Sequence, residues 1–275
     1  MGSVQPSLSQ AVKLREMMAI ARMDFNVFND RFIWSRRLFD RQGRCFEYKI
    51  LCSINQAACS IGISGNFIFM LVRIHPDNPQ PEALKSVVEI LRGGGVIIYP
   101  TDTVYGIGCD ITNKKAVERV AKIKGLKPEK ANLSIICYDL SHITDYAKLG
   151  DNRTFKIMKR CLPGPFTFIL TASSKMPKIF MAKKKTIGLR IPDHNIPREL
   201  VRLLGNPIVT TSIRDEDDII EYSTDPELIH EKFEFIVDCV IDGGYGNQIP
   251  STMVNCADGG TEIVREGLGD LSLLD

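Results

Sequence analysis

From residue 70 onward, short apolar runs alternate with amphipathic segments that are long enough to form helices. The runs are rich in β-branched residues and too short for most helices, so they have the character of buried strands. Strands that alternate with helices favour an α/β fold, with helices packed on the faces of a sheet. The expected strands lie in VIIY, LSIIC, FTFIL, TIGLRI, PIVTTS, FIVDCV and EIVRE.

Four helices are expected between these strands. The first begins at Pro81, and its apolar residues recur at helical spacing until the glycines at 93–95 end it. The others are expected near residues 113–124, 152–161 and 197–204, each stopping near a glycine or a proline.

Residues 1–69 differ from the rest of the chain. They mix Arg-rich and Phe-rich pieces with no clear period of 2 or 3.6 residues. Two interpretations stay open. The segment is either a helical or targeting appendage, or an upstream stretch added because the start codon was placed too early. The second is favoured, with residues 70–275 as the folded domain and 1–69 as an extension outside it.

Composition excludes several classes of protein. The net charge of +2 and the pI near 8.1 are too mild for a generally basic nucleic-acid protein, so a basic site would have to be local. The 8 cysteines form no CxxC pair and the 4 histidines have no metal-ligand spacing, so no zinc site is expected. The cysteines indicate reduced thiols in a cytoplasmic protein, and no apolar run is long enough to cross a membrane.

The loop PTDTVYG places two hydroxyls, a carboxylate and a phenol directly after an expected strand. Loops after strands often carry functional residues. On these residues alone, a binding loop and an ordinary turn stabilised by Asp102 and its neighbouring threonines are equally good interpretations.

Several motifs occur together and in one order across residues 70–275. They are YPTDTVYGIGCD, LPGPFTFIL, KKKTIGLRIPDH, VTTS, PSTMVN and VREG. In this order they resemble the threonylcarbamoyl-AMP synthases of the YrdC/YciO family, and HPDNPQ and IDGGYGNQ are similar to the YciO branch. Six short motifs in order are far more specific than any single one.

The resemblance implies a YrdC/RibB-like fold, a twisted, open mixed sheet with helices on its faces and a concave basic cleft. The cleft would bind ATP, L-threonine and bicarbonate, with Mg²⁺ carried by the nucleotide. The implied reaction converts threonine to its carbamate and then to an adenylate, releasing pyrophosphate. A separate transferase would use the adenylate to modify adenosine in tRNA, and the family surface implies binding of tRNA or double-stranded RNA.

The resemblance also assigns roles to individual residues. The threonine-rich loop of the family falls on Thr101, Thr103 and Tyr105, which would seat threonine or its carbamate. The catalytic lysine of the family falls on Lys124, at the end of a helix, where a lysine also suits the helix dipole. The other expected pocket residues are Arg190, Ser212, Arg214, Ser251, Thr252 and Arg265.

Two positions depart from the synthase pattern. Leu126 stands where the family has an arginine two residues after the lysine, and neighbouring Lys127 does not supply a bidentate guanidinium contact. Arg214 stands where the synthases have an asparagine after Ser212, although an arginine still suits a phosphate. These departures put full synthase activity in question.

A second function therefore stays open, a YciO-type RNA- or nucleotide-binding protein with weak or no synthase activity. Lysines at 183–185, with Lys175 and Lys178, could extend the basic cleft along an RNA backbone. Solvated surface lysines are the alternative explanation. The sequence contains no GxxxxGK[ST] phosphate-binding loop and no GxSxG nucleophile motif.

Overall fold

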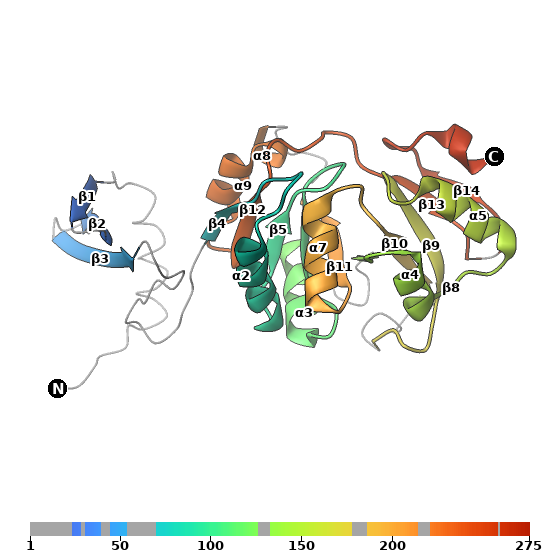
Figure 1. The fold of residues 1–275 in the computed structure, drawn as a ribbon, viewed down its shortest axis with the longest axis horizontal. Helices are drawn as coiled ribbons and strands as arrows, with labels where there is room; N and C mark the ends of the chain where they lie inside the picture. Colours follow the sequence, from blue (N-terminus) through green and yellow to red (C-terminus); the bar gives the residue numbers. More distant parts are fainter. Residues whose placement is uncertain are drawn as a thin grey trace. The chain divides into compact units, whose positions relative to one another are not determined.

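The computed structural model describes residues 24–28, 31–39, 45–53, 70–125, 133–177, 186–213, 221–257 and 259–275. The chain divides into two compact units, Met1–Phe67 and Ile68–Asp275. In the first unit, β1 (Asp24–Phe28), β2 (Arg31–Phe39) and β3 (Cys45–Ser53) form an antiparallel sheet in that order (Figure 1). This sheet is not among the expected elements, because its sequence shows no clear alternation. That residues 1–69 are an added extension stays a prediction.

The described part of the second unit contains one mixed sheet in the order β14-β13-β9-β10-β7-β11-β6-β5-β12-β4, with β8 paired to β9. Parallel pairs such as β12 with β5 occur beside antiparallel pairs such as β11 with β6. The bounds are β4 Met70–Arg73, β5 Ile97–Tyr99, β6 Gly106–Asp110, β7 Ser134–Ile136, β8 Ala147–Lys148, β9 Phe166–Ala172, β10 Thr186–Arg190, β11 Ile208–Ser212, β12 Cys239–Asp242, β13 Thr252–Asn255 and β14 Glu262–Arg265.

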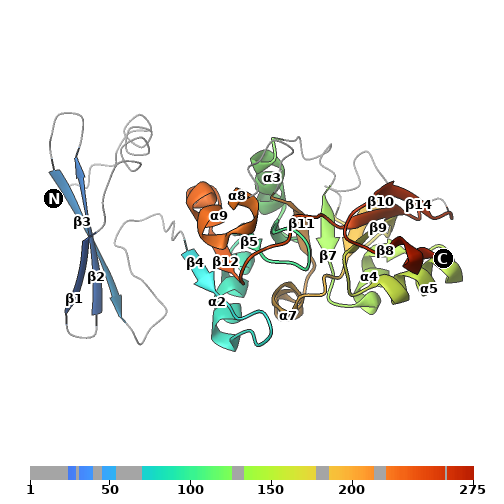
Figure 2. The same cartoon turned by 90° about the horizontal axis from the view of Figure 1, so that it is seen from above.

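Helices cover both faces of this sheet. They are α2 Pro81–Arg92, α3 Lys114–Ile123, α4 Leu140–Tyr146, α5 Asn152–Cys161, α7 Asn195–Leu204, α8 Glu221–Thr224 and α9 Pro226–Phe233, with a 3-10 turn at Leu271–Leu274. Figure 2 shows α2 and α7 on one side of the central strands, and α3, α8 and α9 on the other. None of the helices in the described ranges is long and apolar enough to span a membrane.

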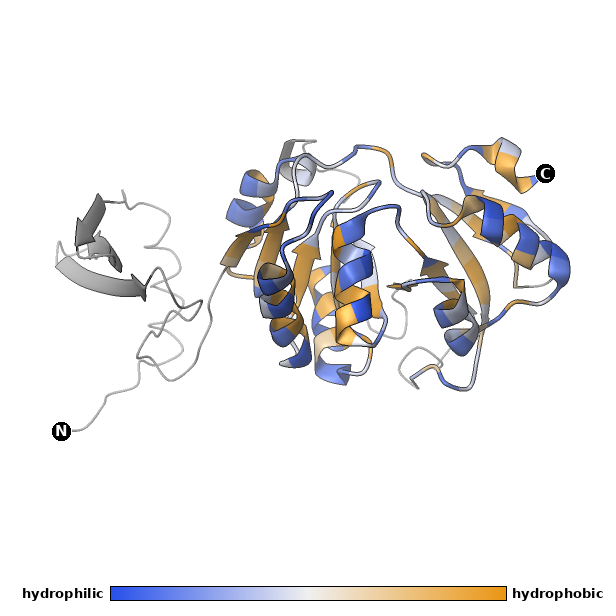
Figure 3. Cartoon of the chain, in the orientation of Figure 1, coloured by the Kyte–Doolittle hydropathy of each residue, from blue (hydrophilic) through white to orange (hydrophobic). Residues whose placement is uncertain are grey.

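The strands supply side chains to two apolar cores in alternation. In β5, Ile97 and Tyr99 pack with residues of α2 and α7, whereas Ile98 packs with residues of α3 and α9. This alternation follows from the period of 2 along a strand. The central strands β5 and β6 are buried along their whole length, as expected for strands covered on both faces, whereas the edge strand β14 is exposed (Figure 3).

The four expected helices are confirmed, together with the signals that begin and end them. Pro81 lies in the first turn of α2 and Gly93 follows its last residue. The side chain of Asp151 accepts a hydrogen bond from the backbone N–H of Thr154 at 2.7 Å, which caps α5. Helix α7 begins two residues earlier than expected, because His194 caps it by accepting from the Ile196 N–H at 3.3 Å.

The prediction for FIVDCV is partly wrong. Phe235 and Ile236 form a turn after α9 and are 40% and 41% exposed, and the strand β12 begins only at Cys239. Asp238 precedes the strand, and its carboxylate accepts a hydrogen bond from the backbone N–H of Val96 at 2.7 Å. Apolar content alone therefore placed the strand too early.

Strand β6 has the sequence GIGCD and is not among the expected strands. A Cβ atom at Gly108 would lie 2.3 Å from the carbonyl oxygen of Val209 on β11. A Cβ at Gly106 would lie 3.1 Å from both Thr210 Oγ1 and the Tyr99 ring. Glycine is thus required here for close approach between neighbouring groups, although it lowers strand propensity.

Candidate active site

A pocket of about 140 Å³ lies where the loop after β5 meets β10, β11 and the segment leading into β13. It is much smaller than the roughly 300–1,000 Å³ of sites for drug-sized ligands. Its polar lining consists of Arg190 and Arg265 together with the hydroxyl residues Thr101, Ser134, Thr167, Thr210, Thr211, Ser212 and Ser251. The pocket therefore suits a small polar molecule, such as an amino acid, that receives hydrogen bonds from the protein.

The structure brings together most of the residues expected from the sequence. Those that line the pocket are Thr101, Tyr105, Arg190, Ser212, Ser251 and Arg265. Thr103, Lys124 and Thr252 are not part of the lining, although Thr103 and Thr252 are next to lining residues in the chain. Arg214 lies outside the described residues, as do Leu126 and Lys127.

Arg190 lies at the buried side of the pocket and pairs with Asp102. Its Nη2 donates a short hydrogen bond to Asp102 Oδ1, and the two side chains are only 10% and 11% exposed. Arg190 Nε and Asp102 Oδ2 are buried and have no hydrogen-bond partner among the described residues. Because unpaired buried polar atoms are costly, this ion pair retains hydrogen-bonding capacity that no described residue uses.

Arg265, at the end of β14, lines the pocket and is exposed to solvent. It donates to the backbone carbonyl of Ser251 from Nη2 at 2.8 Å and from Nε at 3.3 Å. Partial burial and the nearby charge of Arg190 lower the pKa of Arg265. Within the described residues no carboxylate forms a salt bridge with it, whereas Arg190 is neutralised by Asp102. The pair of arginines thus leaves about one positive charge for a ligand.

The threonine-rich loop is held by its own hydroxyls. Thr101 Oγ1 donates to the Val104 carbonyl at 2.8 Å and accepts from the Thr103 N–H at 3.1 Å. Thr103 is fully buried. Tyr105 Oη donates to the Gly244 carbonyl at 2.7 Å. Thr103 therefore stabilises the turn and does not line the pocket. Thr101 and Tyr105 stabilise the loop and also form part of the pocket wall.

Lys124 and Thr252 make contacts beside the pocket. Lys124 is the C-cap residue of α3, and its Nζ donates a hydrogen bond to the backbone carbonyl of Ile213 at 3.4 Å. Ile213 directly follows the pocket residue Ser212 in the chain. Thr252 is fully buried. Its Oγ1 donates to the Gly269 carbonyl and accepts from the Gly267 N–H, both at 3.1 Å. The Thr252 hydroxyl thus anchors the C-terminal segment.

Several pocket residues were missed in the sequence. Thr210 lies two residues before Ser212 on β11 and therefore on the same face of the strand. The expected role of Ser212 could have predicted that Thr210 also lines the pocket. Thr167 Oγ1 on β9 lies 2.8 Å from Oγ of Ser251, the residue before β13. Ser134 comes from β7, and nothing in its local sequence distinguishes it.

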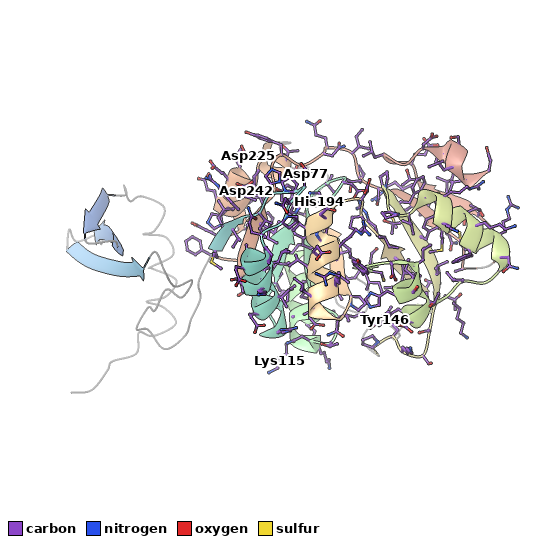
Figure 4. The ribbon with its side chains drawn as sticks, in the orientation of Figure 1. Asp77, Lys115, Tyr146, His194, Asp225 and Asp242 are labelled. Atoms are coloured by element: carbon purple, nitrogen blue, oxygen red, sulfur yellow. The ribbon has the colours of Figure 1, made fainter. Side chains whose placement is uncertain are left out.

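Acidic residues gather at one end of the sheet beyond Tyr105. Figure 4 shows Asp225, Asp242, Asp77 and His194 at this end of the domain. Burial raises the pKa of Tyr105, and the charges of Asp242 and Asp225 raise it further, so its hydroxyl stays a donor. Burial lowers the pKa of His194, which keeps this cap neutral at physiological pH. The described residues contain no group of three or more His, Cys, Asp or Glu side chains placed to hold a metal ion.

Comparison with known proteins assigns the family. Residues 89–267 match the sequence model of the Sua5, YciO and YrdC proteins, which carries the description "telomere recombination". The chain belongs to the Sua5/YciO/YrdC family. It is 42% identical over 199 residues to the uncharacterized protein YciO of Escherichia coli K12, covering 72% of this chain and 95% of that one. An uncharacterized Haemophilus influenzae protein is also 42% identical over 197 residues, with 71% and 94% covered.

Solved structures of the family have the same fold. The crystal structure of E. coli YciO matches with a TM-score of 0.69 and 40% identity, covering 75% of this chain and 99% of that one. Pyrococcus abyssi Sua5 in complex with L-threonine matches with a TM-score of 0.65 and 25% identity, covering 72% of this chain and 57% of that one. The resemblance found in the sequence, including the YciO branch and the twisted mixed sheet, is confirmed.

Proposed function

We propose that this family member catalyses a threonylcarbamoyl-AMP synthase-type reaction, in which L-threonine, bicarbonate and ATP give threonylcarbamoyl-adenylate, pyrophosphate and water. The observation that carries the proposal is the small pocket with two arginines and a lining of hydroxyl donors. A zwitterionic amino acid fits its size and presents a carboxylate to its positive charge. The similarity to a Sua5 protein solved with L-threonine supports the same ligand class.

The chain's own groups suit each stage of this chemistry. Arg190 and Arg265 would hold the threonine carboxylate, leaving the amine to react with bicarbonate and form a carbamate with loss of water. The resulting carbamate oxygen would attack the α-phosphorus of ATP while pyrophosphate departs. Negative charge accumulates at that step, and positioned cationic donors stabilise it most strongly in a water-poor site.

ATP is too large for the enclosed pocket and would extend from its mouth. Lys124 lies beside the end of β11, where its ammonium could approach phosphate oxygens. Mg²⁺ would enter with the nucleotide as part of the substrate and neutralise the phosphates. The proposal extends to a tRNA-modifying transferase that consumes the adenylate and to a cytoplasmic location.

One observation favours the second candidate, a nucleotide- or RNA-binding protein without synthase activity. Leu126 occupies the position of the family arginine, so one guanidinium that could contact phosphate in the synthase reaction is lost.

Another observation weakens the RNA-binding part of this second candidate. Lys175, one of the lysines considered for RNA, pairs with Asp145 at 2.6 Å, which reduces its availability to a phosphate backbone. RNA binding by the remaining lysines stays a prediction.

Product formation distinguishes the two candidates. The full chain is incubated with ATP, Mg²⁺, L-threonine and bicarbonate, and pyrophosphate and the adenylate are quantified. We expect product that requires both L-threonine and bicarbonate and that falls at least tenfold in Lys124→Ala. Lys122→Ala, an exposed lysine at the end of the same helix, is the matched control and should retain activity. ATP binding without adenylate formation would favour the binding protein.

A further inference from the structure

A buried tyrosine reaches a residue of the pocket across a neighbouring strand. Tyr99 lies on β5 and is fully buried, and its Oη lies 2.5 Å from Oγ1 of the pocket residue Thr210 on β11. Strand β6 lies between β5 and β11. The tyrosine side chain therefore spans a whole strand to make one hydrogen bond.

The glycines of β6 make this crossing possible. Gly106 pairs with Tyr99, and Gly108 pairs with Thr210 on the other side of the strand. A Cβ at Gly106 would lie 3.1 Å from the Tyr99 ring, and one at Gly108 would lie 3.2 Å from it. The Gly-x-Gly pattern thus leaves space for the aromatic ring of Tyr99 to cross β6.

The burial of Tyr99 fixes the direction of this hydrogen bond. A phenol has one proton, and Thr210 is the sole hydrogen-bond partner found for Tyr99 Oη within the described residues. If Thr210 were the donor, the phenol proton would be left buried and unpaired, which is costly. Burial also raises the pKa of Tyr99, so the proton remains on the phenol. Tyr99 donates, and Thr210 accepts.

This direction determines what Thr210 offers to a ligand. One lone pair of Thr210 Oγ1 is occupied by the Tyr99 proton, so the threonine's own proton must point to another acceptor. Thr210 is partly exposed and lines the pocket. Arg190 lines the same pocket as Thr210, and its charge acts on the Tyr99 hydroxyl. A hydroxyl that already accepts a hydrogen bond is a stronger donor.

We propose that Tyr99 is a positioning residue that turns the Thr210 hydroxyl into a dedicated donor for the anionic group held at Arg190. The inference rests on the proposed function for the identity of that anion, a threonine carboxylate. A neutral alcohol or amide would gain less from this arrangement. The Tyr99–Thr210 pair thus favours carboxylate over its uncharged analogues.

Titration calorimetry with L-threonine and with inorganic phosphate tests the pair. We expect Thr210→Val to weaken L-threonine binding roughly tenfold to hundredfold, as for a lost hydrogen bond to a charged group. Thr210→Ser, which keeps the hydroxyl, should restore affinity. Tyr99→Phe should weaken binding several-fold, whereas Tyr146→Phe on α4, outside the pocket lining, should not (Figure 4).

The double variant separates positioning from a general structural effect. If Tyr99 acts through Thr210, Tyr99→Phe should cause no further loss of affinity in the Thr210→Val background. Unchanged or tighter binding by Tyr99→Phe would overturn the inference, because Thr210 would then be the donor to the phenol. A wild-type protein that binds phosphate but not L-threonine, with the same variant pattern, would uphold the pair and contradict the proposed function. Binding of neither ligand would overturn both.

Discussion

Replacing Arg190 with methionine is expected to lower the free energy of unfolding by about 3 kcal/mol, because it leaves the carboxylate of Asp102 buried without a cation. For a domain of this size the loss corresponds to a fall in Tm of roughly 6–12 °C. L-threonine binding and adenylate formation should also be lost. Thermal unfolding and ligand titration measure the two effects separately.

A double variant distinguishes the stability role of Arg190 from its ligand role. Removing the carboxylate as well, in Asp102→Ala with Arg190→Met, leaves no unpaired buried charge, so stability should recover in part relative to Arg190→Met alone. Ligand binding should remain absent, because the guanidinium is still missing. Additive destabilisation in the double variant would show that the two side chains do not depend on each other.

Gly108→Ala is expected to destabilise the domain by about 3 kcal/mol. The new Cβ would lie 2.3 Å from the Val209 carbonyl oxygen and 2.7 Å from the Ile208 side chain, so the central strands β6 and β11 must separate. Because Thr210 follows Val209 directly, L-threonine affinity should fall too. Chemical or thermal unfolding measures the first effect and calorimetry the second.

Gly260 provides a matched control for this substitution. It lies on the described C-terminal part of the chain, is exposed, and has no atom within 4 Å of the position a Cβ would take. Gly260→Ala should therefore change the free energy of unfolding by no more than about 0.5 kcal/mol. Equal stability of the two alanine variants would contradict the close approach of β6 and β11.

Elements with strong local signals could be predicted from the sequence. Pro81 and the glycines after Arg92 mark both ends of α2, and Asp151 marks the start of α5. Strand β6 could not be predicted, because its glycines are explained by neighbours on β5 and β11 that are distant in sequence. FIVDCV was misplaced because an apolar turn and an apolar strand have the same composition.

The pocket residues could likewise be predicted only where a sequence motif contains them, and not where their role depends on contacts with distant parts of the chain. Family motifs identified Arg190, Ser212 and Ser251, whose side chains line one cavity although their motifs are far apart in sequence. The resemblance alone does not show that the Thr252 hydroxyl is occupied by the backbone of the C-terminal segment. The role of Tyr99 emerges only from the strand order, since its partner Thr210 is 111 residues away.

This pocket is expected to hold L-threonine through its two arginines. Calorimetric titration of the full chain with L-threonine tests it most directly, using Arg265→Met as the pocket variant. Arg202→Met is the control, since Arg202 pairs with Glu199 on the surface of α7. We predict one-to-one binding that is at least tenfold weaker in Arg265→Met and unchanged in Arg202→Met. Equal affinity in all three proteins, or no binding by the wild type, would contradict the claim.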